Sequence, residues 1–188
     1  MVDVIVFHHA LGLTPGVRAF ADRIGAAGHR VMVPDLYHGE TFDSIDAGVA
    51  HAEATGFDTI IDRGAAAAAA LEEPFVTIGF SLGVLPAQHL AQTHPGAVGA
   101  VLCHAAIRLG TFADTWPGGV ALQLHNAPDD TWGDVEEAEA LVAAVPGAEL
   151  FLYETSAHLV AEPDLSGYDP GIAEQILERS LQLLADVS

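Results

Sequence analysis

The chain has 188 residues, and 26 acidic against 6 basic residues give it a formal net charge of −20 at pH 7. Hydrophobic residues make up 51% of the chain and charged residues only 17%. This balance predicts a globular protein, because disorder requires high charge together with low hydrophobicity. All six basic residues are arginines and they form no basic run, so nucleic acids and anionic membranes are not expected partners.

The sequence also indicates a compartment. Cys103 is the only cysteine, so an internal disulfide cannot form and nothing indicates an oxidising environment. The first residues show no basic region before an apolar stretch, and no window approaches the roughly 18 apolar residues of a membrane span. We therefore expect a cytoplasmic protein without a signal peptide.

Six short apolar runs predict β-strands. The runs are continuous rather than alternating, as expected for strands that are covered on both faces of a parallel sheet. They lie at residues 2–8, 30–33, 75–80, 98–104, 120–125 and 149–153.

Helical patterns separate these runs. Thr14 followed by Pro15 predicts the start of a helix, since Thr is a good N-cap and Pro suits the first helical position. Residues 65–70 are all alanine and predict a helix interior, and another helix is expected over residues 84–93. The apolar face of a closing helix is marked by Ile172, Ile176, Leu177, Leu181 and Leu184.

The alternation of strands and helices predicts one three-layer α/β domain over residues 1–188. Its sheet should be mostly parallel, with about six strands flanked by helices. No linker, repeat or charge block divides the chain, and a chain this short leaves no room for an inserted lid domain. An open cleft and small substrates would follow.

Residues 79–83 read Gly-Phe-Ser-Leu-Gly and connect a predicted strand to a predicted helix. This is the G-x-S-x-G pattern in the context that a nucleophile elbow requires. Gly79 and Gly83 leave room for a sharp turn, which would hold the Ser81 hydroxyl over the carboxyl edge of the sheet. The alternative is an ordinary strand-to-helix turn with a serine N-cap.

A serine nucleophile needs a base and a group that orients the base. In folds with such an elbow, an acid and then a histidine follow the serine, each on a loop after a later strand. Asp129, Asp130 and Asp134 follow the run at 120–125, and His158 follows the run at 149–153. The order and the placement both fit a catalytic triad with three candidate acids.

Further motifs occur in order along the chain. They are His-His-Ala-Leu-Gly at 8–12, Pro-Asp-Leu-Tyr at 34–37, the elbow at 79–83, H-x-x-x-x-D from His125 to Asp130, Ala157-His158, and Ser-Gly-Tyr at 166–168. In these motifs the chain resembles the dienelactone hydrolase family, over nearly its whole length. The resemblance implies the α/β-hydrolase fold, cleavage of esters or lactones, and no requirement for a cofactor.

The resemblance also implies roles for single residues. It selects Asp130 as the acid, with Asp129 as the close competitor, while Asp134 is better interpreted as a helix N-terminal residue. The oxyanion hole would come from the backbone N–H of Leu82 and, by resemblance, from that of Ala10.

The chain departs from the best-known family members at three positions and in one region. Ser81 stands where they carry cysteine, His9 where they carry a glutamate, and Glu162 where they carry one of two arginines that bind the substrate carboxylate. No arginine occurs between Arg30 and Arg63, where the second should fall. An anionic substrate would meet acidic side chains there, so neutral esters or lactones are the expected substrates.

Four side chains are candidates for the walls of the substrate pocket: His9, Tyr37, Trp132 and Glu162. Core packing would account equally well for Tyr37 and Trp132. The chain has ten histidines, but it shows neither H-E-x-x-H nor a Cys/His cluster, so no metal site is predicted. His104 and His125 follow or end strands, and we expect core residues that are bonded to backbone.

The expected function is hydrolysis of a small neutral carboxylic ester or lactone through an acyl-enzyme, with Ser81, His158 and Asp130 as the triad. The alternative is a non-catalytic binding or sensor protein that keeps the fold, a hypothesis motivated by the altered residues His9 and Glu162. Acyl transfer or cleavage of a C–C bond is a further possibility that keeps the enzyme class. The sequence leaves the physiological substrate and the oligomeric state open.

Overall fold

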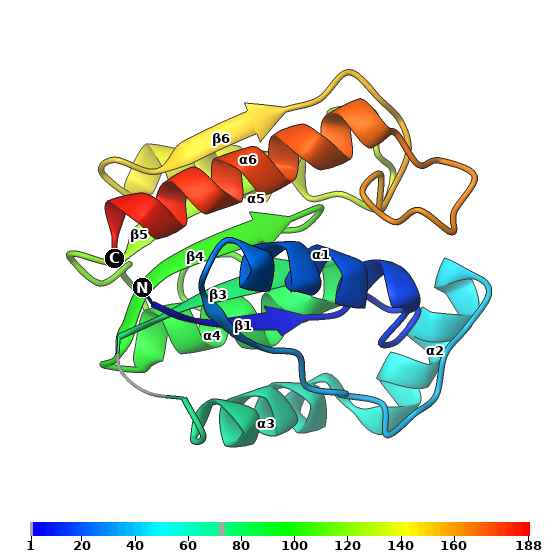
Figure 1. Ribbon diagram of the computed structural model, residues 1–188, viewed down its shortest axis with the longest axis horizontal. Coiled ribbons are helices and arrows are strands. Elements are labelled where there is room, and N and C mark those ends of the chain that lie inside the picture. The colour runs from blue at the N-terminus through cyan, green and yellow to red at the C-terminus, as the bar shows by residue number, and fades with distance from the viewer. Residues whose placement is uncertain (1, 72–73) are drawn as a thin grey trace.

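The computed structural model describes residues 2–71 and 74–188, and a parallel sheet of six strands lies at its centre (Figure 1). The strands are β1 (Asp3–Phe7), β2 (Arg30–Met32), β3 (Phe75–Phe80), β4 (Ala97–Cys103), β5 (Ala121–Asn126) and β6 (Glu149–Leu152). Their order is β2-β1-β3-β4-β5-β6, and each neighbouring pair is parallel. All six predicted strands are confirmed, with ends that differ by at most one residue.

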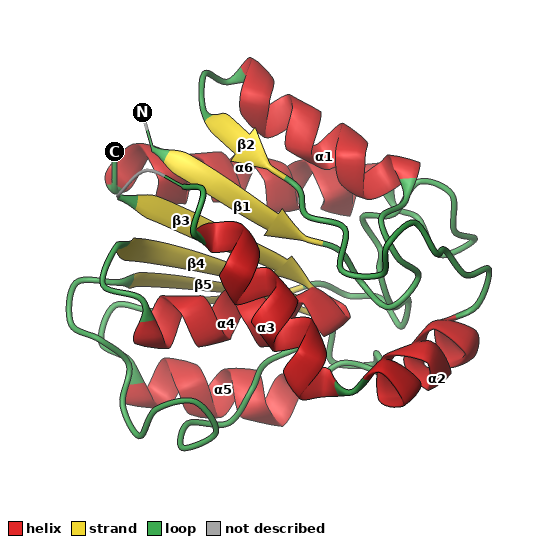
Figure 2. Cartoon of the chain, turned by 90° about the horizontal axis from the view of Figure 1, so that it is seen from below, coloured by secondary structure: helices red, strands yellow, loops and turns green. Residues whose placement is uncertain are grey.

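Helices cover both faces of the sheet, which confirms the predicted α/β architecture (Figure 2). One face carries α1 (Pro15–Ala26) and α6 (Pro170–Asp186), the other carries α3 (Phe57–Ala68), α4 (Val84–Thr93) and α5 (Val135–Ala144), and α2 (Ile45–Thr55) lies beyond the carboxyl ends of the strands. Each face has its own apolar core. Strand β3 is buried at every position, which explains why its sequence is a continuous apolar run. No helix of the described residues is both long and apolar enough to cross a membrane.

Local patterns predict the start of one helix correctly and the end of another wrongly. Helix α1 begins as expected, because Thr14 is its N-cap and the Thr14 hydroxyl accepts a hydrogen bond from the backbone N–H of Val17 at 3.3 Å. The prediction of helix interior over residues 65–70 is wrong at its end, since α3 ends at Ala68. The next three N–H groups bond to carbonyls three residues back, so the last turn tightens. Alanine propensity carries no signal for such an end.

The parallel sheet brings the loops that follow the strands to one edge. In parallel α/β sheets this carboxyl edge is where ligands bind. Ala10 follows β1, Ser81 follows β3, Asp130 follows β5 and His158 follows β6. The fold therefore collects the candidate residues from segments that are far apart in the sequence.

Candidate active site

Ser81 lies at a strained turn directly after β3. Its backbone φ is +49°, in the left-handed region that non-glycine residues rarely adopt. A Cβ atom at Gly79 would lie 2.5 Å from the carbonyl oxygen of Gly83, and one at Gly83 would lie 2.4 Å from the carbonyl oxygen of Phe7. The two glycines therefore allow the close approach of backbone segments that a nucleophile elbow requires.

Replacing Gly83 with alanine is expected to destabilise the protein by about 1–3 kcal/mol, because the new methyl group would meet the β1 backbone and not a flexible side chain. Gly83 has an ordinary φ of −63°, so the effect tests the close approach and not backbone strain. Urea unfolding measures the change. Gly118→Ala is the matched control, since no described atom lies within 4 Å of a Cβ there. Equal midpoints for the two variants would contradict the prediction.

Ser81, His158 and Asp130 form a continuous chain of hydrogen bonds. The Ser81 hydroxyl lies 2.8 Å from His158 Nε2, and His158 Nδ1 lies 2.6 Å from Asp130 Oδ2. An ionised carboxylate can only accept, so Nδ1 donates to Asp130 and Nε2 is left to accept from the serine. His158 and Asp130 are 9% and 5% exposed, so solvent competes little for these bonds. This is the arrangement in which a histidine can take a proton from a serine.

The structure separates the three candidate acids. Asp129 and Asp134 are exposed, and Asp134 is the N-cap residue of α5, whereas Asp130 is buried against His158. Burial alone would raise the pKa of the Asp130 carboxyl. The hydrogen bond from His158 and the one from the Trp132 backbone N–H, at 2.9 Å, outweigh burial and lower that pKa. Asp130 is therefore held as a carboxylate.

The loop after β1 lies against the elbow. Strands β1 and β3 are neighbours, with Phe7 paired to Gly79, and the carbonyl oxygens of Phe7 and His8 would lie within 2.7 Å of a Cβ at Gly83. Ala10, which is 3% exposed, follows in this loop. The two predicted oxyanion donors, the amides of Ala10 and Leu82, thus belong to backbone segments that are packed together.

His9 and Glu162 form a buried pair beside this loop. His9 Nε2 lies 2.8 Å from Glu162 Oε2, and the two side chains are almost fully buried. Burial would raise the pKa of Glu162, but hydrogen bonds from His9 and from the Thr14 hydroxyl outweigh it and lower the pKa. With His104, the pair lines a cavity of about 10 Å³, enough for a single water. The predicted pocket candidates His9 and Glu162 are therefore bound to one another.

An open groove of about 410 Å³ reaches His158 from the side of α2. Trp132, a predicted pocket residue, forms part of its wall, is 44% exposed, and has its ring centroid 6.5 Å from that of His158. The lining residues are Leu11, Asp43, Ser44, Ile45, Thr131, Trp132, Ser156, Ala157, His158, Leu165, Ser166 and Gly167. They include apolar side chains and one carboxylate but neither arginine nor lysine.

Comparison with known proteins identifies the family. The family model "Dienelactone hydrolase family" matches residues 2–188. The chain belongs to the dienelactone hydrolase family. Membership supports a hydrolase of the dienelactone hydrolase type and confirms the resemblance seen in the motifs. No curated protein sequence matches the chain significantly.

Solved structures share the fold at low sequence identity. A dienelactone hydrolase-like promiscuous phosphotriesterase from metagenomic libraries superposes with a TM-score of 0.81 and 17% identity, over 100% of this chain and 87% of that chain. Dienelactone hydrolase from Anabaena variabilis gives 0.71 and 14%, over 99% and 87%. One of the metagenome-derived lipolytic enzymes LipS and LipT gives 0.67 and 16%, over 98% and 94%. At these identities the likeness shows the α/β-hydrolase fold.

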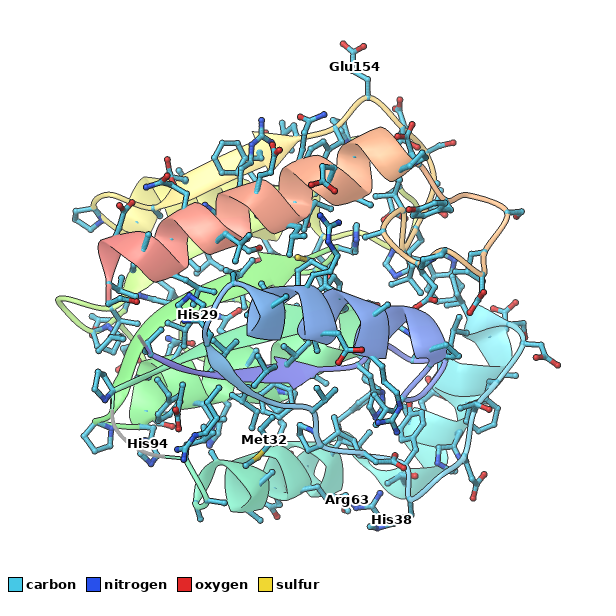
Figure 3. All side chains as sticks on the ribbon, in the orientation of Figure 1. His29, Met32, His38, Arg63, His94 and Glu154 are labelled. Carbon is cyan, nitrogen blue, oxygen red and sulfur yellow. The ribbon has the colours of Figure 1, made fainter. Side chains whose placement is uncertain are left out.

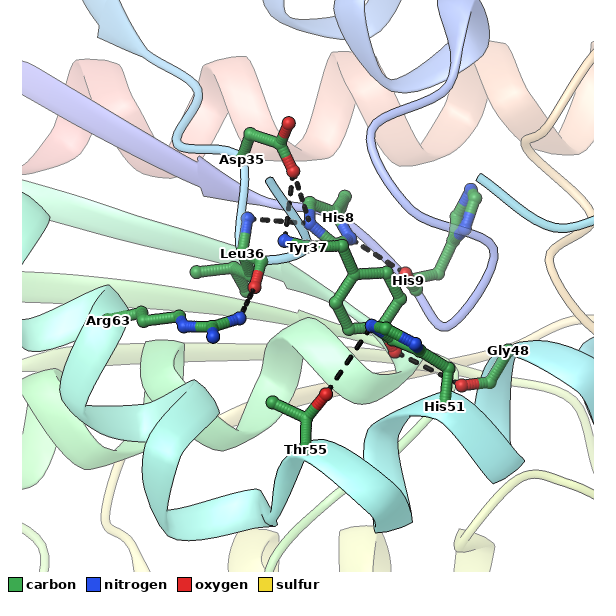
Figure 4. A network of polar contacts seen from close by, with 9 residues as sticks. All are labelled: His8, His9, Asp35, Leu36, Tyr37, Gly48, His51, Thr55 and Arg63. Carbon is green, nitrogen blue, oxygen red and sulfur yellow. Dashed lines mark hydrogen bonds and ion pairs between the residues drawn. The ribbon is translucent and has the colours of Figure 1, made fainter. Parts of the chain in front are cut away.

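Tyr37, the last of the predicted pocket residues, lies in the core of this family member (Figure 4). Its side chain is 2% exposed, and its ring contacts His8, Phe42 and His51 edge-on. Its hydroxyl donates a hydrogen bond to the carbonyl oxygen of Gly48 in α2 at 3.2 Å. Tyr37 therefore packs against α2 and is not one of the groove's lining residues.

Sequence reasoning missed a buried polar network behind the site. Arg179 donates to the Tyr153 hydroxyl at 2.9 Å, this hydroxyl lies 2.7 Å from His125 Nδ1, and His125 Nε2 lies 2.9 Å from Gln123 Oε1. The expectation that His125 bonds to backbone is therefore wrong. The network ties α6 to β5 and to the residue that follows β6, just before the loops of Asp130 and His158, through contacts that no local pattern reveals.

His104 differs from the expectation in another way. It is 1% exposed, its ring contacts that of His158 edge-on at 5.8 Å, and burial lowers its pKa to about 3. Among the described residues neither ring nitrogen has a hydrogen-bond partner, although its backbone N–H donates to His125 at 2.8 Å. His104 is thus a neutral neighbour of the candidate base.

The remaining histidines are dispersed. His29 and His94 precede β2 and β4 and lie toward the amino ends of the strands, away from the site (Figure 3). Within residues 2–71 and 74–188, no group of three or more His, Cys, Asp or Glu side chains is arranged to hold a metal ion.

Proposed function

We propose that the protein is a serine hydrolase of small neutral carboxylic esters or lactones. The observation that carries the proposal is the hydrogen-bond chain from Ser81 through His158 to Asp130, built on a nucleophile elbow. Membership in a hydrolase family supports it. The groove beside His158 offers room for a small substrate, and its walls combine polar side chains with apolar ones such as Leu11 and Trp132.

The reaction would proceed in two halves. His158 Nε2 takes the proton of Ser81 as the Ser81 oxygen attacks the substrate carbonyl. Asp130 stabilises the imidazolium that forms on His158. The amides of Leu82 and Ala10 receive the negative charge on the carbonyl oxygen. His158 then protonates the departing alcohol. In the second half, water loses a proton to His158 and attacks the acyl-enzyme, and His158 then returns that proton to the Ser81 oxygen as the acid leaves.

A fluorophosphonate probe tests the nucleophile. Ser81 should be labelled covalently, and hydrolysis of a short p-nitrophenyl ester should stop in proportion to labelling. Iodoacetamide is the matched reagent: Cys103 is fully buried and burial raises the pKa of its thiol, so activity should survive. A folded protein that neither binds the probe nor hydrolyses the ester would favour the non-catalytic binding protein.

Neutral esters should be preferred over anionic ones. For two p-nitrophenyl esters of equal length, we expect kcat/KM to be at least about 10-fold higher for the one without a terminal carboxylate, because the groove carries the Asp43 carboxylate and is lined by neither arginine nor lysine. Added salt should bring the two kcat/KM values closer together, since charges are screened over about 8–10 Å. Equal kcat/KM values at low salt would contradict this preference.

A further inference from the structure

Glu162 connects three segments of the chain at one buried point. It lies four residues after His158 and is 4% exposed. Its Oε2 atom is 2.8 Å from His9 Nε2, in the loop after β1, and 2.7 Å from the Thr14 hydroxyl, at the N-terminus of α1. The segment with the candidate base and the loop with Ala10 are therefore joined through one carboxylate.

The surrounding structure is shaped to hold this carboxylate. A Cβ atom at Gly16 would lie 1.8 Å from Glu162 Oε1, so the first turn of α1 leaves space for the acidic side chain. A helix N-terminus favours negative charge, and hydrogen bonds to an ionised acceptor are stronger than those between neutral groups. Burial removes the competition from water. The link to His9 is consequently well suited to fixing geometry.

The opposite side of His9 is also fixed. His8 Nδ1 lies 2.8 Å from the carbonyl oxygen of His9, and His8 Nε2 accepts from the Leu36 backbone N–H at 3.0 Å (Figure 4). The carbonyl oxygen of Ala10 approaches α2 so closely that a Cβ at Gly48 would lie 2.0 Å from it. Glu162 supplies the remaining constraint on the loop, from the side of α1.

We infer that Glu162 is a positioning residue, which acts through His9 to orient the Ala10 amide toward the oxyanion. This inference rests on the proposed function. Glu162 does not act as a substrate contact, because its side chain is buried and is not among the residues that line the groove beside His158. A displaced Ala10 amide would weaken stabilisation of the transition state but leave binding of the substrate largely intact. The expected effect is therefore a lower kcat with little change in KM.

A double-mutant cycle tests the inference with a neutral p-nitrophenyl ester. Glu162→Ala and His9→Ala are each expected to lower kcat by about 10- to 100-fold, with KM changed by less than about threefold. The double variant should be no slower than the slower single variant, because both changes remove one link. Additive losses, an unchanged kcat, or a loss confined to KM would each overturn the inference.

Conservative variants separate positioning from a general loss of stability. Glu162→Gln keeps an acceptor oxygen for His9 and Thr14, so it should retain kcat within about fivefold of the wild type. Glu174→Gln is the control for removal of a carboxylate, since Glu174 pairs with Arg23 at the exposed surface, and it should leave kcat unchanged. A kcat for Glu162→Gln as low as that for Glu162→Ala would contradict the positioning role.

Two further comparisons distinguish loss of the positioning role from misfolding and from failure of the proposed function. If Glu162→Ala does not fold, His9→Gln, whose amide can still donate to Glu162, should retain more kcat than His9→Ala; equal values would overturn the inference. Failure of the proposed function looks different, because the wild type itself would then show no Ser81-dependent turnover. A wild type that is active through Ser81, with no effect in the cycle, rejects the positioning role alone.

Discussion

Replacing Ser81 with alanine is expected to lower kcat for a p-nitrophenyl ester by about 10⁴- to 10⁶-fold. The serine oxygen forms the bond to the acyl group, and it is the hydroxyl that lies against His158 Nε2. Steady-state rates on the purified variant, together with loss of fluorophosphonate labelling, measure the effect. The residual rate should come from the oxyanion donors and from binding.

The Ser81→Ala variant should stay folded, so its kcat can be compared directly with that of the wild type. Alanine keeps the Cβ of residue 81 and removes only the hydroxyl, so the elbow and its close glycine contacts persist. Ser180→Ala is the matched control: this serine is buried, and its hydroxyl bonds to the Ile176 carbonyl oxygen within α6. It should keep full activity. Turnover in Ser81→Ala within about tenfold of the wild type would rule out the proposed mechanism.

Replacing Asp130 with asparagine is expected to lower kcat by about 10²- to 10⁴-fold. Unless the asparagine amide rotates, its NH2 group faces His158 Nδ1 and cannot accept a hydrogen bond from it. The amide is also neutral, so it supplies no negative charge to stabilise the imidazolium. Asp129→Asn is the matched control, because Asp129 is the adjacent carboxylate but is exposed. Its rate should equal that of the wild type. Comparable losses in the two variants would contradict the assignment of Asp130.

The ionisation of Asp130 also makes the stability of the folded protein depend on pH. The pKa of Asp130 is lowered from the ordinary value of 3.8, so its ionised form stabilises the folded protein above that value. This contribution is lost as the pH falls through the lowered pKa. The free energy of unfolding of the wild type, relative to that of Asp130→Asn, should therefore fall as the pH is lowered below 3.8. Urea unfolding at several pH values measures it.

Local patterns predicted the elements well where burial and turn chemistry act over a few residues. The continuous apolar run of β3 and the Thr14-Pro15 start of α1 both formed as expected. The end of α3 did not, because alanine residues favour a helix without specifying where it stops. Strand identity thus follows from hydrophobicity, while helix ends depend on which carbonyls the next amides reach.

By itself, the sequence determined the order of strands and helices, the elbow around Ser81 and the presence of an acid and a histidine after later strands. Only the tertiary structure decided that Asp130 and not Asp129 reaches His158, and that His9 and Glu162 pair across 153 positions. Adjacent residues have nearly the same sequence context, yet their side chains point in different directions once the chain folds. Contacts between distant segments depend on the sheet that brings those segments together, and no local periodicity records them.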